Sequence, residues 1–253
     1  MLKASRIICI TVWILFICNT VFSSSLVLTQ GYEGVAFFPE DSDDTTAVYR
    51  YIYRYPGIES QYESDDAINE FFDYQLNDAL SFTAPLFAME AEENTGSYTR
   101  VDYQITCNDA VFFSTLFSHE HFFGASSINF WTAYSFLRQG EGAGMVLSLA
   151  DILGLTTPAE DDGLTYERMT RQSNELIYDL IWEIIVEQLD IAGYDYYEGL
   201  TRDDLVAEFY PENDFYIDQN HTLVFFIQPT MIASAASGIL LFPFSIDELL
   251  SEL

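Results

Sequence analysis

The sequence predicts an α+β fold in which an antiparallel sheet packs against helices, arranged as two closely associated subdomains. Segments with a two-residue hydrophobic period occur beside segments with a helical period. Of the 253 residues, 49% are hydrophobic and 16% are aromatic, so the chain can bury a large core. After residue 23 the chain has a single cysteine, so that part cannot form an internal disulfide. Its stability must therefore come from the hydrophobic core.

The N-terminus has the pattern of a secretory signal peptide. Lys3 and Arg6 precede an apolar run from Ile7 to Phe22, and serines follow. The run is shorter than the roughly 20 residues that a membrane-spanning helix needs, so we expect residues 1–23 to be a signal that is removed. This predicts a secreted or extracytoplasmic protein, with a retained signal anchor as the alternative.

The rest of the chain is divided between two predicted subdomains, residues 24–157 and 163–253. In the first, strict alternation over Ala47–Tyr55 predicts a strand that Pro56 and Gly57 end. The tyrosines on one side of this strand are expected to pack within the fold. The alternative is a platform of aromatic rings on which a sugar stacks.

Further elements of the first subdomain follow from the same patterns. A helical period begins at Ser64, the expected N-cap, and runs to about Leu80. Tyr98–Cys107 and Ala110–Phe117 flank a short Asn-Asp turn and predict a β-hairpin. A third strand, Ile128–Phe136, completes the expected sheet.

The second subdomain follows a predicted seam at residues 156–163. A long amphipathic helix opens at Thr165, and a shorter one spans Arg202–Phe209. Leu223–Ile227 and Ile239–Phe244 are dense apolar runs, typical of central strands with no solvent face.

Cys107 is the cysteine that stands outside the signal segment. Residue alternation places it on the face of Val101, Tyr103 and Ile105. We therefore expect a thiol buried in the core rather than a nucleophile.

The charge and the lysine content exclude several functions. Nine Lys and Arg stand against 40 Asp and Glu, a net charge of -31, which leaves no basic surface for a nucleic acid. The only lysine is Lys3, so a phosphate-loop lysine, a Schiff-base lysine and a pyridoxal site are excluded together. No cofactor is expected.

Two patterns offer chemistry, and neither defines a site. His119-Glu120-His121 puts two imidazoles on one side of a strand, but with three His in the chain a polar strand end is favoured over a metal site. A hydrolase needs two carboxylates as acid and base, and the sequence singles out no pair. We expect no catalytic, cofactor-binding or metal-binding residues, with a carboxylate-dependent cell-envelope glycan hydrolase as the alternative.

The C-terminal part of the chain carries a motif made of an apolar strand, a segment of small residues and a closing proline. Its matching positions are Leu223–Phe226, Ile232-Ala233, Ala235-Ala236, Gly238 and Pro243. Weaker matches lie upstream, at Tyr55–Ile58, Ala67–Asn69 and Leu147–Leu153. The motif resembles the extracytoplasmic domain family of the lysozyme-sensing anti-sigma-V factor, which also precedes the catalytic domain of some peptidoglycan deacetylases.

This resemblance implies a non-catalytic extracytoplasmic binding or sensing module. It implies a basic secreted protein such as lysozyme as the partner, which the acidic charge also favours, with cell-wall glycan as a second candidate. A sigma factor is not an expected partner, because only Met1 to Arg6 precede the apolar run. Two loops depart from the family motif and form the candidate partner-binding site, with the residues Thr230, Met231, Ile232, Ser234, Phe123 and Ser126.

Overall fold

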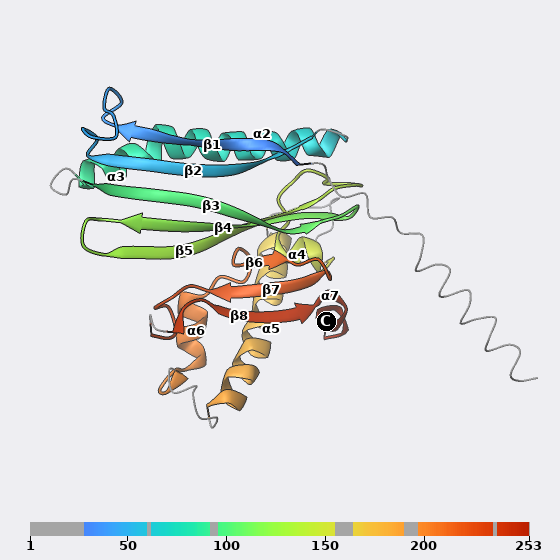
Figure 1. The fold of residues 1–253 in the computed structure, drawn as a ribbon. Coiled ribbons are helices and arrows are strands. Elements are labelled where there is room, and N and C mark those ends of the chain that lie inside the picture. Colours follow the sequence, from blue (N-terminus) through green and yellow to red (C-terminus); the bar gives the residue numbers. More distant parts are fainter. Residues whose placement is uncertain are drawn as a thin grey trace, which may run out of the picture.

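The protein is described from a computed structural model, which places residues 28–59, 62–91, 96–154, 164–189, 197–234 and 237–252. Within these residues it has two sheets, with helices packed against both (Figure 1). The α+β class predicted from the sequence is therefore confirmed. The signal segment and the predicted seam lie outside the described residues, so the subdomain boundaries stay a prediction.

The first sheet has five strands in the order in which they occur along the chain. Its strands are β1 (Leu28–Phe38), β2 (Tyr49–Ile58), β3 (Ser97–Asn108), β4 (Phe112–Phe122) and β5 (Ser127–Leu137). Three of its pairs are antiparallel, and β2 and β3 are parallel. Parallel neighbours need a crossover, which here runs through α2 (Glu63–Asp78), a π-helical turn (Ala79–Thr83) and α3 (Ala84–Glu90). The sheet is thus mixed and not purely antiparallel.

The crossover helices cover one face of this sheet and bury the tyrosines of β2. Tyr49, Tyr51 and Tyr55 are 0%, 3% and 6% exposed. Phe72 of α2 contacts the rings of β4 and β5, including Phe117 at 5.8 Å between centroids. The expected packing of the tyrosines is confirmed, and a sugar platform on this face is excluded because α2 and α3 cover it.

Two predicted element boundaries are corrected by the structure. Strand β2 continues through Pro56 and Gly57 to Ile58. Proline is tolerated there because the pairing with β3 ends at Tyr53, so its missing N–H is not needed on that side. Ser64 lies inside α2 instead of capping it, and its hydroxyl donates to the carbonyl of Arg138 at 2.7 Å.

The second sheet is antiparallel and has three strands, β6 (Phe215–Ile217), β7 (Thr222–Ile227) and β8 (Leu240–Ser245). Figure 1 shows α5 (Leu164–Gln188) running behind it and α6 (Arg202–Glu208) at one end. The short helix α4 (Leu149–Ile152) lies near the junction with the first sheet. A second short helix, α7 (Ile246–Ser251), follows β8. The long helix, the short helix and both predicted strands are confirmed within one or two residues.

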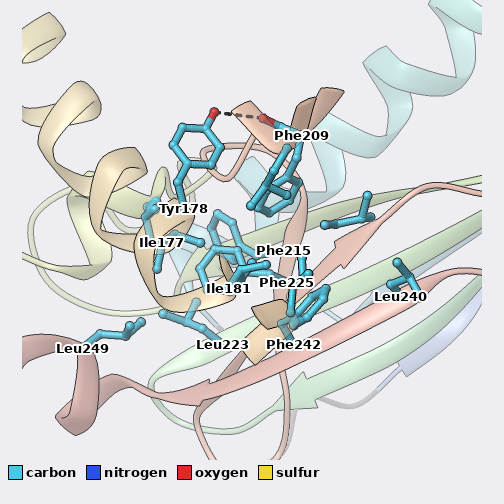
Figure 2. Packing of buried hydrophobic residues seen from close by; sticks show 14 of the residues in the cluster. Ile177, Tyr178, Ile181, Phe209, Phe215, Leu223, Phe225, Leu240, Phe242 and Leu249 are labelled. Carbon is cyan, nitrogen blue, oxygen red and sulfur yellow. Dashed lines mark hydrogen bonds between the residues drawn. The ribbon is translucent and has the colours of Figure 1, made fainter. Parts of the chain in front are cut away.

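Apolar side chains of α5 and the second sheet form a core of their own (Figure 2). Ile177 and Ile181 of α5 and Phe225 of β7 have no exposed surface. The Tyr178 hydroxyl donates to the Phe209 carbonyl at 2.9 Å, which satisfies a polar group at the edge of this core. Strand β8 does have a solvent face, since Leu241 is 47% exposed, so the sequence expectation for this strand was wrong.

A β-bulge sends Cys107 to the opposite side of the first sheet from the one predicted. The register shifts between Ile105, which faces Thr115, and Cys107, which faces Ser114. The extra residue reverses the alternation, so Cys107 packs in the second core while Val101 packs in the first. The thiol is buried as expected, at 1% exposure, but not on the face of Val101, Tyr103 and Ile105.

Strands of the two sheets are joined by specific contacts. The N–H of Ile217 in β6 donates to the Ser114 hydroxyl of β4 at 3.1 Å. The Gln228 side chain, just after β7, accepts from the Trp131 N–H at 2.9 Å and donates to the Trp131 carbonyl at 2.6 Å. Gln228 thus pairs with β5 as another strand would. Among the described residues, no helix is long and apolar enough to cross a membrane.

Candidate functional site

The first predicted loop is the turn between β4 and β5. Phe123 is partly buried, because its ring stacks on His121 and contacts Phe87. Ser126 is exposed, and its carbonyl accepts from the Phe123 N–H at 3.1 Å. Of the two residues, Ser126 is the one that a partner can reach with its side chain.

The second predicted loop follows β7. Thr230 and Met231 are exposed, and Thr230 has a left-handed backbone with φ at 72°. Ser234 is exposed as well, with its hydroxyl 3.4 Å from that of Ser237. Ile232 is 6% exposed and belongs to the second core, so it anchors the loop and is not accessible to a partner. The loop's role in binding stays a prediction.

A groove of about 370 Å³ lies on β3, β4 and β5. Its β4 and β5 residues flank the first predicted loop in the chain. The Trp131 N–H donates to Gln228, which lies two residues before the second predicted loop. The charged side chains of the groove form ion pairs, with Arg100 3.6 Å from Glu120 and Asp102 2.9 Å from Arg54 of the neighbouring strand β2. The groove therefore suits an uncharged polar ligand better than an ion. Its lining residues are Arg100, Asp102, Ser118, His119, Glu120, Asn129, Phe130 and Trp131.

The two histidines of β4 pack against a phenylalanine ring. His119 and His121 stack on Phe130 at 4.5 and 5.1 Å between centroids. The His119 Nε2 is 2.9 Å from the Thr132 hydroxyl, and burial lowers the pKa of His119 to about 4. Glu120 points to the other face, where it bonds to Tyr98. The three side chains of the His-Glu-His sequence therefore do not converge on one point.

The exposed side of α5 carries a row of acids. Glu175, Asp179, Glu183 and Glu187 follow one another at four-residue intervals and are all exposed. Arg202 of α6 bridges the first two, at 2.7 and 2.8 Å. Within the described residues, Glu183 and Glu187 form no ion pair. Their four-residue spacing could have been read from the sequence, and sequence reasoning did not single it out.

A cavity of about 390 Å³ lies between β5, the residues after it and the segment that leads into β6. Asp214 and Glu212 line it together with residues 132–135 of β5. Burial raises the pKa of Asp214 to about 6. Glu212 accepts a hydrogen bond from the Asn174 amide. The cavity thus contains one acid with the raised pKa that a general acid requires.

A cluster of Cys107, Asp109 and His221 lies where a turn of the first sheet meets a turn of the second. The Cys107 thiol donates to Asp109 Oδ2 at 3.5 Å, and the same oxygen lies 2.5 Å from His221 Nε2. Burial and the Asp109 carboxylate raise the pKa of Cys107 to about 12. The thiol is therefore protonated near neutral pH, which opposes a role as a nucleophile. Sequence spacing gives no sign of this cluster, because His221 lies in a turn of the second sheet, more than 100 residues along the chain from the other two.

Comparisons with known proteins identify the fold. No family model matches the chain, and no curated protein matches it. Among solved structures, a member of the DUF3298 family from Bacteroides fragilis matches with a TM-score of 0.51 and 12% identity, covering 90% of this chain and 99% of that one. A DUF3298 family protein from Pseudomonas aeruginosa matches with a TM-score of 0.51 and 11% identity, covering 90% and 94%. The chain has a DUF3298-type fold.

The DUF3298 likeness extends over nearly the whole of both solved proteins, so the fold includes both sheets. At such low identity it establishes a fold and assigns no activity. It fits the extracytoplasmic family expected from the sequence motif only loosely. The link to the anti-sigma-V factor therefore stays a prediction.

Proposed function

We propose that this chain is a non-catalytic extracytoplasmic binding module that captures a basic secreted protein such as lysozyme. The observation that carries the proposal is the row of acids on α5. Like charges four residues apart destabilise a helix by about 0.2–0.5 kcal/mol per pair. Arg202 offsets this repulsion for two of the four acids, and a cationic partner would offset it for Glu183 and Glu187.

The charge of the whole chain supports the same class of partner. Five arginines of the described residues are already paired with acids, and the net charge is -31. Such a surface attracts cationic proteins and repels anionic wall polymers. The attraction is screened over about 8 Å at physiological salt, so a specific complex also needs close contacts. The signal-peptide pattern and the resemblance to a lysozyme-sensing family support the extracytoplasmic setting.

The test is calorimetry of the full chain with lysozyme at low and at physiological salt. Glu183→Gln with Glu187→Gln should weaken binding about tenfold, equivalent to ~1.4 kcal/mol. The matched control is Asp66→Asn with Glu70→Gln on α2, which removes the same charge from two exposed acids at the same spacing. The control should bind as the wild type does at physiological salt.

Three results would contradict the proposal in different ways. Absence of binding at low salt removes lysozyme as the partner. Equal losses in both double variants show that charge acts without a defined surface. Equal binding of an unrelated protein of similar positive charge, lost at physiological salt, reduces the interaction to non-specific attraction.

A glycan hydrolase is the second candidate, and the raised pKa of Asp214 in its cavity favours it. A general acid of this kind protonates the leaving oxygen, while a second carboxylate acts from the opposite side. Release of sugar from peptidoglycan by the wild type, abolished in Asp214→Asn, would establish this candidate. The binding module predicts no release.

A further inference from the structure

Three side chains that can bind a metal meet where the turn between β3 and β4 approaches the turn between β6 and β7. They are Cys107, Asp109 and His221, and one donor atom from each lies within 4.8 Å of the others. The cluster is separate from the acids of α5 and from the groove on β3 to β5. Its sulfur, nitrogen and oxygen donors are those that Zn²⁺ takes in proteins.

We propose that Cys107, Asp109 and His221 form a binding site for Zn²⁺ or a similar divalent cation. Zinc binds thiolate, imidazole and carboxylate at about 2.0–2.3 Å, so tetrahedral neighbours lie roughly 3.3–3.8 Å apart. The cation displaces the proton of the Cys107 thiol, which is released to solvent as the metal–sulfur bond forms. The Cys107 sulfur and the Asp109 oxygen are already 3.5 Å apart. His221 is 2.5 Å from that oxygen, so the imidazole moves outward by about 1 Å to admit the cation.

The Asp109 carboxylate is oriented by its own turn. Its Oδ1 accepts from the N–H of Val111 at 2.7 Å and from the N–H of Phe112 at 2.9 Å. This leaves Oδ2 directed at Cys107 and His221. Such outer hydrogen bonds fix the orientation of a ligand carboxylate before the metal arrives.

The His221 ring is positioned by a strained backbone and a neighbouring ring. His221 has φ at 58°, a conformation that costs most residues other than glycine free energy. Its N–H donates to the Asp218 carbonyl at 3.0 Å, and its ring meets Phe112 edge-on at 5.2 Å between centroids. The turn thus holds the imidazole beside Asp109.

The surrounding charges favour a cation. Asp218 lies in the same turn as His221, whose N–H donates to its carbonyl at 3.0 Å, and it adds a second carboxylate beside that of Asp109. Arg138 is the nearby positive group, and it donates to the Asp109 carbonyl. Its charge is offset by Asp65, 3.8 Å away and equally buried. A bound dication would therefore meet a net negative site.

Binding at this place would connect the two sheets. Cys107 and Asp109 belong to the first sheet and its turn, and His221 precedes β7 of the second. With three protein ligands, the fourth position of a tetrahedral cation is open to water or to Asp218. The cation would thus stabilise the arrangement of the sheets in addition to the direct contacts between their strands.

The test uses the full chain with Cys9→Ser and Cys18→Ser, which leaves Cys107 as the sole thiol. Calorimetry should show one Zn²⁺ per chain, and Co²⁺ should give a thiolate-to-metal charge-transfer band in the near ultraviolet. Cys107→Ser and His221→Gln should each weaken Zn²⁺ binding at least about tenfold. His119→Gln is the control, since it removes an imidazole outside the cluster.

Zinc should also raise the melting temperature of the wild type and leave that of His221→Gln unchanged. The His221 side chain is 41% exposed, so His221→Gln keeps its fold. It therefore tests the site even if the buried Cys107→Ser variant fails to fold. Failure of the wild type to bind zinc at micromolar concentration would overturn the site. So would zinc binding that survives both substitutions, or bound Co²⁺ without the thiolate band.

Discussion

His119 is a partly buried imidazole whose environment selects the neutral form. It stacks on Phe130, lies beside the Thr132 hydroxyl, and has His121 as a neighbour whose positive form would repel its own. Burial, and to a lesser degree His121, lower the pKa of His119 from 6.5 to about 4. The same residue in the unfolded chain binds a proton at higher pH.

This difference predicts a loss of stability in mild acid. Because the folded pKa lies below the unfolded one, the contribution of His119 is present above pH 6.5 and is lost as the pH falls through 4. The upper limit is on the order of 3 kcal/mol, from about 1.4 kcal/mol per pKa unit, and partial exposure reduces it.

Denaturant unfolding of the wild type and of His119→Gln, compared at pH 7 and pH 4.5, measures this contribution. The free energy of unfolding should fall more in the wild type than in the variant. Asp214 acts in the opposite sense, since its raised pKa stabilises the fold at low pH and that contribution is lost as the pH rises through 6. Both proteins carry Asp214, so its effect cancels in the comparison.

At the scale of elements, strands β7 and β8 pack in different ways. Five consecutive residues of β7, Leu223–Ile227, are buried, because its neighbours β6 and β8 flank it and both of its faces are covered. Strand β8 is at the edge, and its side chains alternate between buried and exposed. A charge therefore meets very different surroundings on the two paired strands.

Phe225→Asp on β7 should be severely destabilising, and Leu241→Asp on β8 should be tolerated. Burial of an unpaired carboxylate costs several kcal/mol, a large part of a total stability of about 5–15 kcal/mol. Leu241 is 47% exposed and pairs with Phe226 of β7. Its variant therefore introduces the same charge into the same sheet, at a position where water solvates the carboxylate. Denaturant unfolding measures both. Equal midpoints in the two variants would contradict the burial of β7.

The elements that sequence patterns predict are those with strong periods of their own. Helix α5 could be predicted because its apolar residues recur on one face at the helical period. Strand β7 could be predicted because both of its faces are buried, which makes its sequence a continuous apolar run. Strand β1 was missed because its glycines lower its strand propensity, and they are needed for close packing: a Cβ at Gly31 would lie 1.9 Å from the Tyr55 carbonyl. The parallel pairing of β2 and β3 depends on the crossover through the helices between them. The alternation of residues within a strand does not indicate the direction of its neighbour.

The candidate sites were less predictable than the fold. The bulge before Cys107 adds one residue, which reverses every inference about which side a later side chain faces. The meeting of Asp109 with His221 depends on how the two sheets dock. The acids of α5, in contrast, share one helix and follow from the sequence alone.

For the whole molecule, the described contacts between the sheets predict a single cooperative unit. The Ser114 hydroxyl of β4 accepts from the Ile217 N–H of β6 and bonds to Thr106 and Ser135 on its own sheet. Trp131 contributes its backbone to Gln228 and its ring to Phe226, with 5.9 Å between centroids. These buried polar and aromatic contacts connect each sheet to the core of the other.

Tryptophan fluorescence can test this cooperativity, because Trp131 of β5 contacts the second sheet and Trp182 of α5 packs against the second core. In a Trp13→Phe background, Trp182→Phe leaves Trp131 as the reporter of the contact between the sheets, and Trp131→Phe leaves Trp182 on α5 as the reporter of the second core. The two unfolding midpoints should coincide.

Ser114→Ala leaves the Ile217 N–H buried without its acceptor, which should lower the free energy of unfolding by about 1–3 kcal/mol at both reporters. Ser118→Ala, exposed on the same strand, should change neither. A shift confined to one reporter would mean that the sheets unfold independently and that their contacts add little to the stability of either.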